Sequence, residues 1–245
     1  MIDLHNHILP DVDDGARSVA DSLGMARALL DQDVTAVCVT PHTTEWSRLG
    51  GRSDLLERVT DLQSAFAETG LGLEILPGAE VHIEPHLPDP ITLNDTPYVL
   101  LELPYDALPP SYDRVIFDLQ VRGLRPIIAH PERITPIADD PNILFELVRR
   151  GCLAQLTAAS LAGVFGSRIK DLSQLLLDHH LAHLIASDAH DTGERLTALP
   201  HARHVCGYDR WLELTTTVPS RIVAGEPVQP AQPVEVRRRR FLGVF

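Results

Sequence analysis

Cysteine is scarce in this sequence, and its placement excludes two common uses of the thiol. The chain of 245 residues has three cysteines, Cys38, Cys152 and Cys206, which lie far apart and form no Cys-x-x-Cys pair. An odd number of isolated cysteines indicates neither a disulfide framework nor a thiolate zinc site. We expect them to be ordinary buried thiols.

Lysine and long apolar runs are also scarce. Lys170 is the only lysine among 21 basic residues. No stretch approaches the roughly eighteen apolar residues that a membrane-spanning helix needs, and the N-terminus lacks the basic start and apolar run of a signal peptide. We therefore expect a cytoplasmic protein without a transmembrane segment.

Positive charge is in deficit over the chain as a whole. The chain has 34 acidic and 21 basic residues, which gives a formal net charge of -13. That charge repels a phosphate backbone and argues against nucleic-acid binding, and an anionic substrate would need locally placed cations. With 44% apolar residues the chain can bury one full core, and single α/β barrels commonly have this length.

Short apolar runs alternate with amphipathic segments along the chain. After a first strand that begins at residue 2, further strands are expected at 36–39, 73–76, 98–101, 126–129, 153–156 and 182–186. Helices are expected at 18–32, 53–69, 112–122, 142–150, 166–180, 195–206 and 208–216. This order is typical of parallel strands joined by right-handed crossovers, and no nucleotide-binding glycine motif supports a doubly wound sheet. The predicted fold class is α/β, a closed or nearly closed barrel of seven strands.

The first strand ends in side chains that suit a metal ion. His5 and His7 are two residues apart, so an extended backbone directs both imidazoles to one face. The loop that follows carries Asp11, Asp13 and Asp14, and such oxygen ligands suit Mn, Mg or a carboxylate-bridged Zn cluster.

Most of the other predicted strands also end in a residue type that binds metals. The residues at or just after the later strand ends are His42, Glu80, Glu102, His130, Thr157, and Asp188 with His190. Singly, each histidine or carboxylate has an ordinary interpretation as a hydrogen-bonded residue. In an α/β barrel, however, these ends converge on one face, so the set together predicts a metal cluster there.

Other histidines have simpler interpretations. His179, His180 and His183 fall at the opposite end of the predicted barrel, where we expect them to be solvated or to face a helix end. His82 and His86 follow Glu80 in an irregular segment and could line the mouth of the site without being ligands.

Short motifs around these residues resemble those of a known superfamily. They are Ile-Asp-Leu-His-Asn-His at 2–7 with Asp-Val-Asp-Asp-Gly at 11–15, Thr-Pro-His at 40–42, Gly-Ala-Glu at 78–80, Glu102, Ala-His-Pro-Glu-Arg at 129–133 and Ser-Asp-Ala-His at 187–190. The sequence resembles the PHP (polymerase and histidinol phosphatase) superfamily. Within it, the sequence resembles the manganese-dependent protein-tyrosine phosphatases of bacterial capsule and exopolysaccharide clusters.

This resemblance implies a distorted seven-stranded, TIM-like barrel of PHP type that holds three divalent ions, Mn first, with Fe or Zn as alternatives. The single catalytic barrel would span residues 1–225, and residues 226–245 would form a Pro-rich, basic tail. The implied ligand sets are His5, His7, Glu80 and Asp188 for one ion, Glu80, Glu102 and His130 for a second, and Asp14, His42 and His190 for a third.

The resemblance also implies a substrate and a partner. Arg133 and Arg195 would match two phosphate-binding arginines, and the substrate would be a phosphotyrosine protein, in particular a bacterial tyrosine autokinase of polysaccharide synthesis. The sequence departs from the family pattern at Asp191 and at Leu196-Thr197, which follow the last motif. The ending has no counterpart, and we expect a loose solvated tail, with a docking element as the alternative.

The expected reaction is phosphomonoester hydrolysis by a hydroxide that bridges two metal ions. Neighbouring cations can lower the pKa of water and bind the phosphoryl oxygens. No cysteine nucleophile is then needed, and the arginine that cysteine phosphatases carry six residues after the thiol is replaced here by Thr44, Ala158 and Leu212.

Three alternatives remain open from the sequence. A small-molecule phosphatase, such as one for histidinol phosphate, could use the same metal set. A non-catalytic PHP module is a second alternative. An amidohydrolase is a third, but it normally bridges its metals with a carbamylated lysine at a strand end, whereas Lys170 falls inside a predicted helix.

Overall fold

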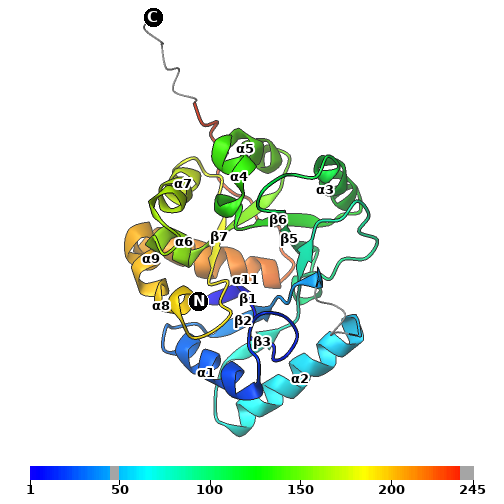
Figure 1. The fold of residues 1–245 in the computed structure, drawn as a ribbon, viewed down its shortest axis with the longest axis vertical. Coiled ribbons are helices and arrows are strands. Elements are labelled where there is room, and N and C mark those ends of the chain that lie inside the picture. The colour runs from blue at the N-terminus through cyan, green and yellow to red at the C-terminus, as the bar shows by residue number, and fades with distance from the viewer. Residues whose placement is uncertain (45–49, 238–245) are drawn as a thin grey trace, which may run out of the picture.

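Eight short parallel strands form the centre of the molecule in the computed structural model, which describes residues 1–44 and 50–237 (Figure 1). The strands are β1 (Ile2–Asn6), β2 (Ala36–Val39), β3 (Glu74–Leu76), β4 (Glu80–His82), β5 (Tyr98–Glu102), β6 (Arg125–Ala129), β7 (Leu153–Thr157) and β8 (Leu184–Ala186). The predicted α/β class with parallel strands is confirmed.

The strands belong to two sheets that are joined at both ends. One sheet has the order β1-β2-β3 and the other β4-β5-β6-β7-β8, and every pair is parallel. Isolated parallel bridges connect Asn6 with Ala189 and His42 with Glu80. These bridges link the first strand to the end of the last and the second strand to the fourth, so the C-terminal ends of strands from both sheets lie together.

The predicted count of seven strands is wrong because the third apolar run is followed by a separate strand. Pro77 and Gly78 interrupt the ladder after β3, and the chain re-enters the second sheet at Glu80. A Cβ on Gly78 would lie 2.6 Å from Cys38 Sγ and 3.1 Å from Val39 O, so only glycine allows the chain to pass this close to β2. The predicted strand end Glu80 is therefore the first residue of β4.

Helices cover the outside of the strands (Figure 1). They are α1 (Val19–Leu30), α2 (Arg52–Glu68), α3 (Tyr112–Val121), α4 (Thr135–Asp139), α5 (Asn142–Arg149), α6 (Ala158–Ala162), α7 (Ser167–Asp178), α8 (Glu194–Thr197), α9 (Leu199–Cys206), α10 (Tyr208–Leu212) and α11 (Val218–Val223), with the short 3-10 turns η2 (Leu93–Asp95) and η3 (Pro131–Arg133) and the π-helical segment η4 (Glu213–Thr217). Ser18 caps α1 as predicted, because its side chain accepts a hydrogen bond from Asp21 N. The helix expected at 195–206 is split in two, and Pro200 lies in the first turn of α9, where its missing N–H costs nothing.

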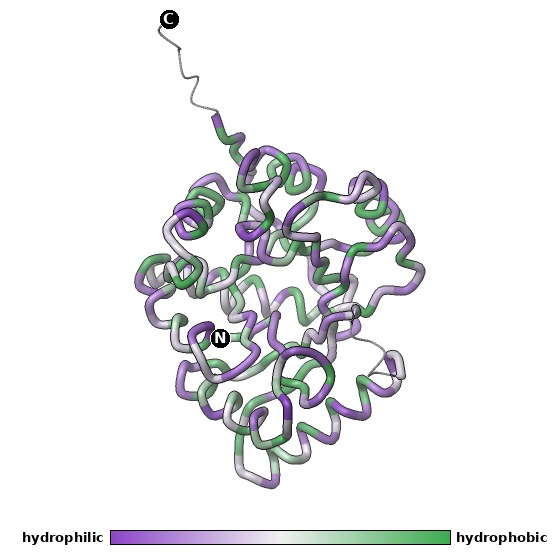
Figure 2. Tube along the Cα trace, in the orientation of Figure 1, coloured by the Kyte–Doolittle hydropathy of each residue, from purple (hydrophilic) through white to green (hydrophobic). Residues whose placement is uncertain are grey.

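Two groups of buried side chains hold the strands in place. A larger cluster packs the strands against the helices, as with Val37, Leu101 and Ile128. A smaller one contains alternate strand residues, such as Leu4, and includes Ile222 of α11. Figure 2 shows hydrophobic residues along the central strands and alternation of hydrophobic and hydrophilic residues around the helices. No helix within the two described ranges is both long and apolar enough to cross a bilayer.

The segment after residue 225 is bound to the barrel, so the expectation of a loose tail is wrong for residues 226–237. The buried Tyr98 hydroxyl donates a hydrogen bond to Glu226 O (2.7 Å) and accepts one from Val228 N (3.0 Å). Further along, Val236 N donates to Asn142 Oδ1 (2.9 Å). Backbone groups of the extended segment thus find partners on the body of the protein. Residues 238–245, which include most of the predicted basic ending, lie outside the described residues.

His183 is buried, contrary to the expectation that it is solvated. Its side chain is 4% exposed, and its Nδ1 accepts a hydrogen bond from Ala154 N (3.0 Å) because the residue lies beside the start of β8, facing the backbone of β7. Burial lowers the pKa of His183 to about 4. The imidazole is therefore neutral in the folded protein at neutral pH.

This burial predicts a pH-dependent contribution to stability. The folded-state pKa lies below the unfolded value of about 6.5, so the unfolded chain takes up the proton first as the pH falls. The stabilisation is complete above about pH 6.5 and is lost towards pH 4. His183→Asn keeps an acceptor for Ala154 N but does not titrate, so the free energy of unfolding of the wild type should fall relative to the variant by on the order of 2 kcal/mol between pH 7.5 and pH 5.

Denaturant unfolding at the two pH values measures this difference. The matched control is His204→Asn on α9, where the side chain is exposed. Equal pH dependence of the wild type and His183→Asn would contradict a neutral buried imidazole.

Candidate metal centre

The nine side chains predicted as metal ligands meet at the C-terminal ends of the strands. They fall into four overlapping groups, and within each group the ligand atoms lie within 4.8 Å of one another. The groups are His7 with Asp14, His42 and His190; His5 with His7 and Asp188; His5 with Glu80 and His130; and His42 with Glu80 and Glu102. Residues up to 185 positions apart in the sequence therefore share one site, as the convergence of strand ends requires.

The site has a buried floor and an accessible mouth. His5, His7, Glu80, His130 and Asp188 are at most 2% exposed. The side chains at the mouth are Glu102 (12% exposed), His190 (17%), His42 (18%) and Asp14 (67%). A buried set of charged and imidazole groups is stable only if each group has a partner, and the mouth gives a ligand access to them.

Hydrogen bonds at the Nδ1 atoms orient the imidazoles of His5, in β1, and of His7, just after it. His5 Nδ1 lies 2.8 Å from Gln155 Oε1, and His7 Nδ1 lies 2.7 Å from Asp13 Oδ2. Both partners are acceptors, so each Nδ1 carries the hydrogen. The two Nε2 atoms then face each other at 3.2 Å. Two lone pairs at this distance need a positive charge between them.

Carboxylates add to this demand for a cation. His5 Nε2 lies 3.1 Å from Glu80 Oε2 and 3.4 Å from Asp188 Oδ1. Burial opposes protonation of His5, but these two carboxylates outweigh it and raise its pKa to about 9. A proton can bind to only one of the two facing nitrogens. A divalent ion, in contrast, can bind both Nε2 atoms and one oxygen each from Glu80 and Asp188. The donor set therefore fits a metal ion.

Glu80 lies at the centre of the cluster. Its Oε1 is 2.8 Å from His130 Nε2, and its Oε2 is 3.0 Å from His42 Nδ1. Oε2 is fully buried and accepts no well-oriented hydrogen bond from any described residue. Although burial favours the neutral acid, the surrounding imidazoles hold the pKa of Glu80 well below its usual range. An ionised carboxylate shared between imidazoles is suited to bridge two cations.

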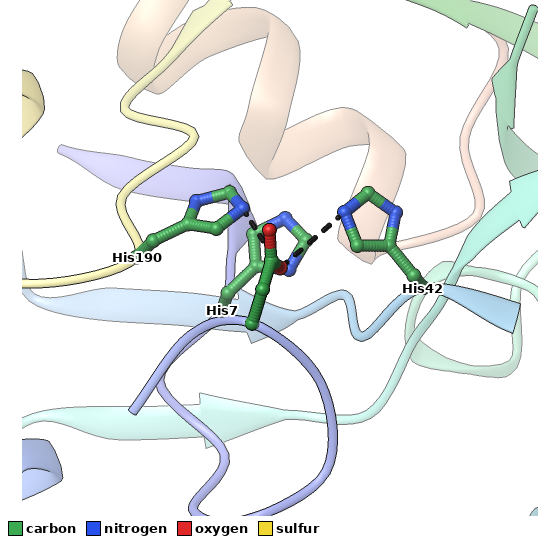
Figure 3. Close-up of side chains that lie close together, drawn as sticks. His7, His42 and His190 are labelled. Carbon is green, nitrogen blue, oxygen red and sulfur yellow. Dashed lines mark ion pairs between the residues drawn. The ribbon is translucent and has the colours of Figure 1, made fainter. Parts of the chain in front are cut away.

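The group that contains Asp14 lies at the mouth, where Figure 3 shows the imidazoles of its other members, His7, His42 and His190, side by side. Asp14 Oδ1 lies 3.2 Å from His190 Nε2 and 3.6 Å from His42 Nε2. The rings of His7 and His190 are stacked at 3.9 Å. The hydrogen bond from His190 lowers the pKa of Asp14. Stacked imidazoles beside an ionised carboxylate again favour a cation.

Two of these residues have an unusual backbone conformation. His130 has a φ of 32° and Asp188 a φ of 54°, in the left-handed region that favours glycine. Such a conformation costs a non-glycine residue about 1–2 kcal/mol. Backbone strain of this kind is concentrated at functional sites, where it aims side chains that regular strands would direct elsewhere.

Both predicted phosphate-binding arginines contact the same carboxylate. Arg133 donates from Nη1 to Asp188 Oδ2 (3.1 Å), and Nη1 of Arg195 lies 2.7 Å from Asp188 Oδ1. The two side chains are 20% and 23% exposed. The departure from the family pattern at Leu196 and Thr197 does not turn Arg195 away, because α8 begins at Glu194 and directs the guanidinium to the cluster. Two positively charged guanidinium groups therefore lie at the mouth of the site, beside its carboxylates.

Sequence reasoning missed the residues that orient the ligands. The loop position of Asp13 predicts only an oxygen ligand, but in the structure Asp13 orients His7 and accepts a hydrogen bond from His42 N (3.1 Å). Gln155 lies inside β7, and nothing in its sequence context distinguishes it. Thr157 is not in the cluster, and its N–H donates to Glu132 Oε1 (2.9 Å). His82 lies beside the site as expected, with Nδ1 3.2 Å from Glu102 Oε2.

Comparison with known proteins finds a family match over most of the chain. A model of the family described as capsular polysaccharide synthesis, CpsB/CapC, matches residues 1–213. The chain is 36% identical to the tyrosine-protein phosphatase YwqE of Bacillus subtilis (strain 168) and 32% identical to the putative tyrosine-protein phosphatase CapC of Staphylococcus aureus, with 100% of each chain covered in both cases. It is 27% identical to the tyrosine-protein phosphatase CpsB of Streptococcus pneumoniae, over 80% of this chain and 85% of that one.

Solved structures give a similar result. A crystal structure from work on YwqE of Bacillus subtilis and CpsB of Streptococcus pneumoniae, described as unique metal-dependent tyrosine phosphatases, superimposes with a TM-score of 0.88 at 34% identity, over 97% of this chain and all of the other. An organophosphorus hydrolase mutant superimposes with a TM-score of 0.55 at 16% identity, over 91% and 92% of the two chains. The second likeness concerns the fold alone.

Proposed function

The chain belongs to the CpsB/CapC family of capsular polysaccharide synthesis proteins, and we propose on this premise that it is a metal-dependent protein-tyrosine phosphatase. The observation that carries the proposal is the pair of facing imidazole nitrogens of His5 and His7, 3.2 Å apart and flanked by Glu80 and Asp188. This arrangement needs a cation, and its position beside Asp188, which Arg133 and Arg195 both contact, suits an anionic ester.

We further propose that the cluster holds three divalent ions, with Mn as the physiological metal. The first would be held by His5, His7, Glu80 and Asp188, the second by Glu80, Glu102 and His130, and the third by Asp14, His42 and His190. The overlap of the four ligand groups at His5, His7, His42 and Glu80 supports shared ligation. The ring of strands would then be a distorted barrel of PHP type.

Different residues of the site would have different roles in the reaction. When bound, the ions would lower the pKa of a water molecule and polarise the phosphoryl oxygens. Arg133 and Arg195 would exchange part of their contact with Asp188 for the equatorial oxygens of the phosphoryl group, where planar guanidinium groups stabilise developing charge. Gln155 and Asp13 keep the Nε2 atoms of His5 and His7 free for the ions.

The proposed substrate is a phosphotyrosine protein, and the proposed partner is a bacterial tyrosine autokinase. The amidohydrolase alternative lacks its bridging lysine, since Lys170 lies in α7 and not at a strand end. Histidinol phosphate remains the alternative substrate that the same metal set could serve.

A substrate panel tests the proposal. Phosphotyrosine peptide, phosphoserine peptide and histidinol phosphate are each assayed with the protein loaded with Mn, Zn or Mg. We expect the highest kcat/KM for the phosphotyrosine peptide with Mn, loss of activity on chelation and recovery on Mn addition. Preference for histidinol phosphate would reassign the substrate, and fewer than one ion per chain after Mn loading would reject the metal site.

The cysteines should be dispensable for turnover. Burial raises the pKa of Cys152 to about 12 and also raises the pKa of Cys38 and of Cys206, so none supplies a thiolate at neutral pH. The triple change Cys38→Ser, Cys152→Ser, Cys206→Ser should leave kcat/KM within about threefold of the wild type, provided that circular dichroism shows the native fold. A phosphocysteine trapped by rapid quenching would overturn the metal-dependent mechanism.

A further inference from the structure

Two aromatic rings flank Arg133 at the mouth of the metal centre. The guanidinium carbon of Arg133 lies 4.8 Å from the centre of the Tyr105 ring and 4.9 Å from the centre of the Phe165 ring. The guanidinium carbon of Arg195 lies 5.8 Å from the Phe165 ring. The Tyr105 ring also lies 5.3 Å from the imidazole of His130. We refer to Tyr105 and Phe165 together as the aromatic frame.

The frame is open to solvent beside a site that is otherwise polar. Tyr105 is 36% exposed, as is Val164 next to Phe165, and Phe165 itself is partly exposed. Exposed apolar groups gathered next to convergent charged groups are typical of a ligand site, because the charged groups bind one part of the ligand and the apolar groups another. Stacking on arginine alone does not require the rings to be accessible.

The backbone holds both rings in place before any ligand binds. Phe165 lies in a tight turn between Gly163 (φ 89°) and Gly166 (φ 95°), closed by a hydrogen bond from Gly166 N to Gly163 O (3.1 Å). Both glycines have a positive φ that other residues rarely adopt, so the turn is specified by sequence. The carbonyl oxygen of Tyr105 accepts a hydrogen bond from Thr135 N (2.7 Å). A preformed frame loses little entropy when it binds a rigid group.

The turn that carries Arg133 and the helix that precedes Phe165 share a buried anchor. Glu132, in η3, is 1% exposed, and its Oε1 accepts a hydrogen bond from the N–H of Thr157 (2.9 Å), the residue directly before α6. The phosphate-binding arginine and one ring of the frame are therefore positioned relative to each other by the same contact.

We propose that the aromatic frame binds the aryl group of the substrate and makes the site selective for aryl over alkyl phosphomonoesters. The inference rests on the proposed phosphatase function and adds the side chains that select the substrate. A phosphoryl group held between the metal ligands and the two arginines directs its ester substituent outward, past Arg133, to Tyr105 and Phe165. A flat aryl ring can stack on these rings, whereas a short alkyl chain cannot.

Binding of two phosphonates to the Mn-loaded protein tests this selectivity without catalysis. Phenylphosphonate and methylphosphonate carry the same anionic head and differ in the group that would meet the frame. Calorimetry should show that the wild type binds phenylphosphonate at least about tenfold more tightly. Phe165→Ala should remove most of this preference, a change of about tenfold, and leave methylphosphonate affinity within about twofold. Phe165→Tyr should retain the preference.

Two further variants keep the test decisive. Phe165→Leu preserves much of the side-chain volume without the ring, so it should also lose the preference even if Phe165→Ala folds poorly. The matched control is Phe117→Ala, because Phe117 on α3 is 59% exposed and lies outside the frame. Phe117→Ala should bind both phosphonates as the wild type does.

The remaining outcomes separate this inference from the proposed function. Equal weakening of both phosphonates in Phe165→Ala and Phe165→Leu would mean that the ring only positions the arginines, and would overturn the inference while the phosphatase proposal stands. Failure of both phosphonates to bind the Mn-loaded wild type would reject the phosphate site itself, and with it the proposed function.

Discussion

Replacement of Glu80 by glutamine should reduce kcat/KM by at least about a thousandfold, which exceeds the 10- to 100-fold loss typical of a residue that only orients a metal ligand. Glu80 is the buried carboxylate that lies within 3.1 Å of both His5 and His42 and is hydrogen-bonded to His130. Glutamine keeps the shape but removes the negative charge. Two cations cannot then share this position without strong mutual repulsion.

Metal analysis and steady-state kinetics on the Mn-loaded protein measure the effect. We expect Glu80→Gln to bind fewer ions per chain as well as to lose turnover, which separates loss of a bridging ligand from loss of a base alone. The matched control is Glu74→Gln on β3, where the side chain is exposed, and it should behave as the wild type. Normal metal content together with normal activity in Glu80→Gln would remove Glu80 from the site.

Replacement of Arg195 by alanine should lower both kcat and kcat/KM by about a hundredfold or more, as loss of a charged oxyanion donor does. In the structure Arg195 contacts Asp188 and lies 2.8 Å from Nδ1 of His190, so its guanidinium already faces the cluster. Arg195→Lys should restore only part of the activity, because an ammonium group cannot reproduce a bidentate contact with a phosphoryl group.

The metal content should distinguish substrate binding from metal binding. An arginine cannot be a ligand, and Arg133 still contacts Asp188 in the variant, so Arg195→Ala and Arg195→Lys should both retain their ions. The control is Arg203→Ala on α9, with a side chain that is 50% exposed, and it should leave kinetics unchanged. Wild-type kinetics in Arg195→Ala with a normal ion content would show that Arg195 does not meet the phosphoryl group.

Local patterns in the sequence predicted most of the elements but not how many strands there are. Apolar runs and their breakers are properties of neighbouring residues, so the positions of β2, β5, β6, β7 and β8 could be anticipated from them. β4 could not, because Glu80, Val81 and His82 form a strand only by pairing with β5. His183 was also misjudged, since its burial depends on the backbone of β7.

The side chains of the candidate site also fall into those that the sequence predicted and those that only the structure reveals. Residue type and position at a predicted strand end pointed to eight of the nine side chains of the cluster, and the loop after the first strand and the family resemblance pointed to Asp14. The family resemblance also pointed to Arg133 and Arg195. Asp13 and Gln155 gave no such signal for their contacts with His7 and His5, because a supporting hydrogen bond is defined by distance and not by spacing. Tyr105 and Phe165 were missed for the same reason, since their common neighbour Arg133 lies on a third segment.

The sequence by itself determined which side chains stand at the ends of parallel strands, and so the kind of chemistry that the protein can perform. This follows from local rules, because strand length, helix periodicity and turn residues act over a few positions. Only the tertiary structure decided that these ends meet. The bridges between Asn6 and Ala189 and between His42 and Glu80 join the two sheets, and they bring His5 and His7 to Asp188 and His42 to Glu80. The physical reason is that such joining depends on the pairing and stagger of all the strands together, a property that no single segment carries.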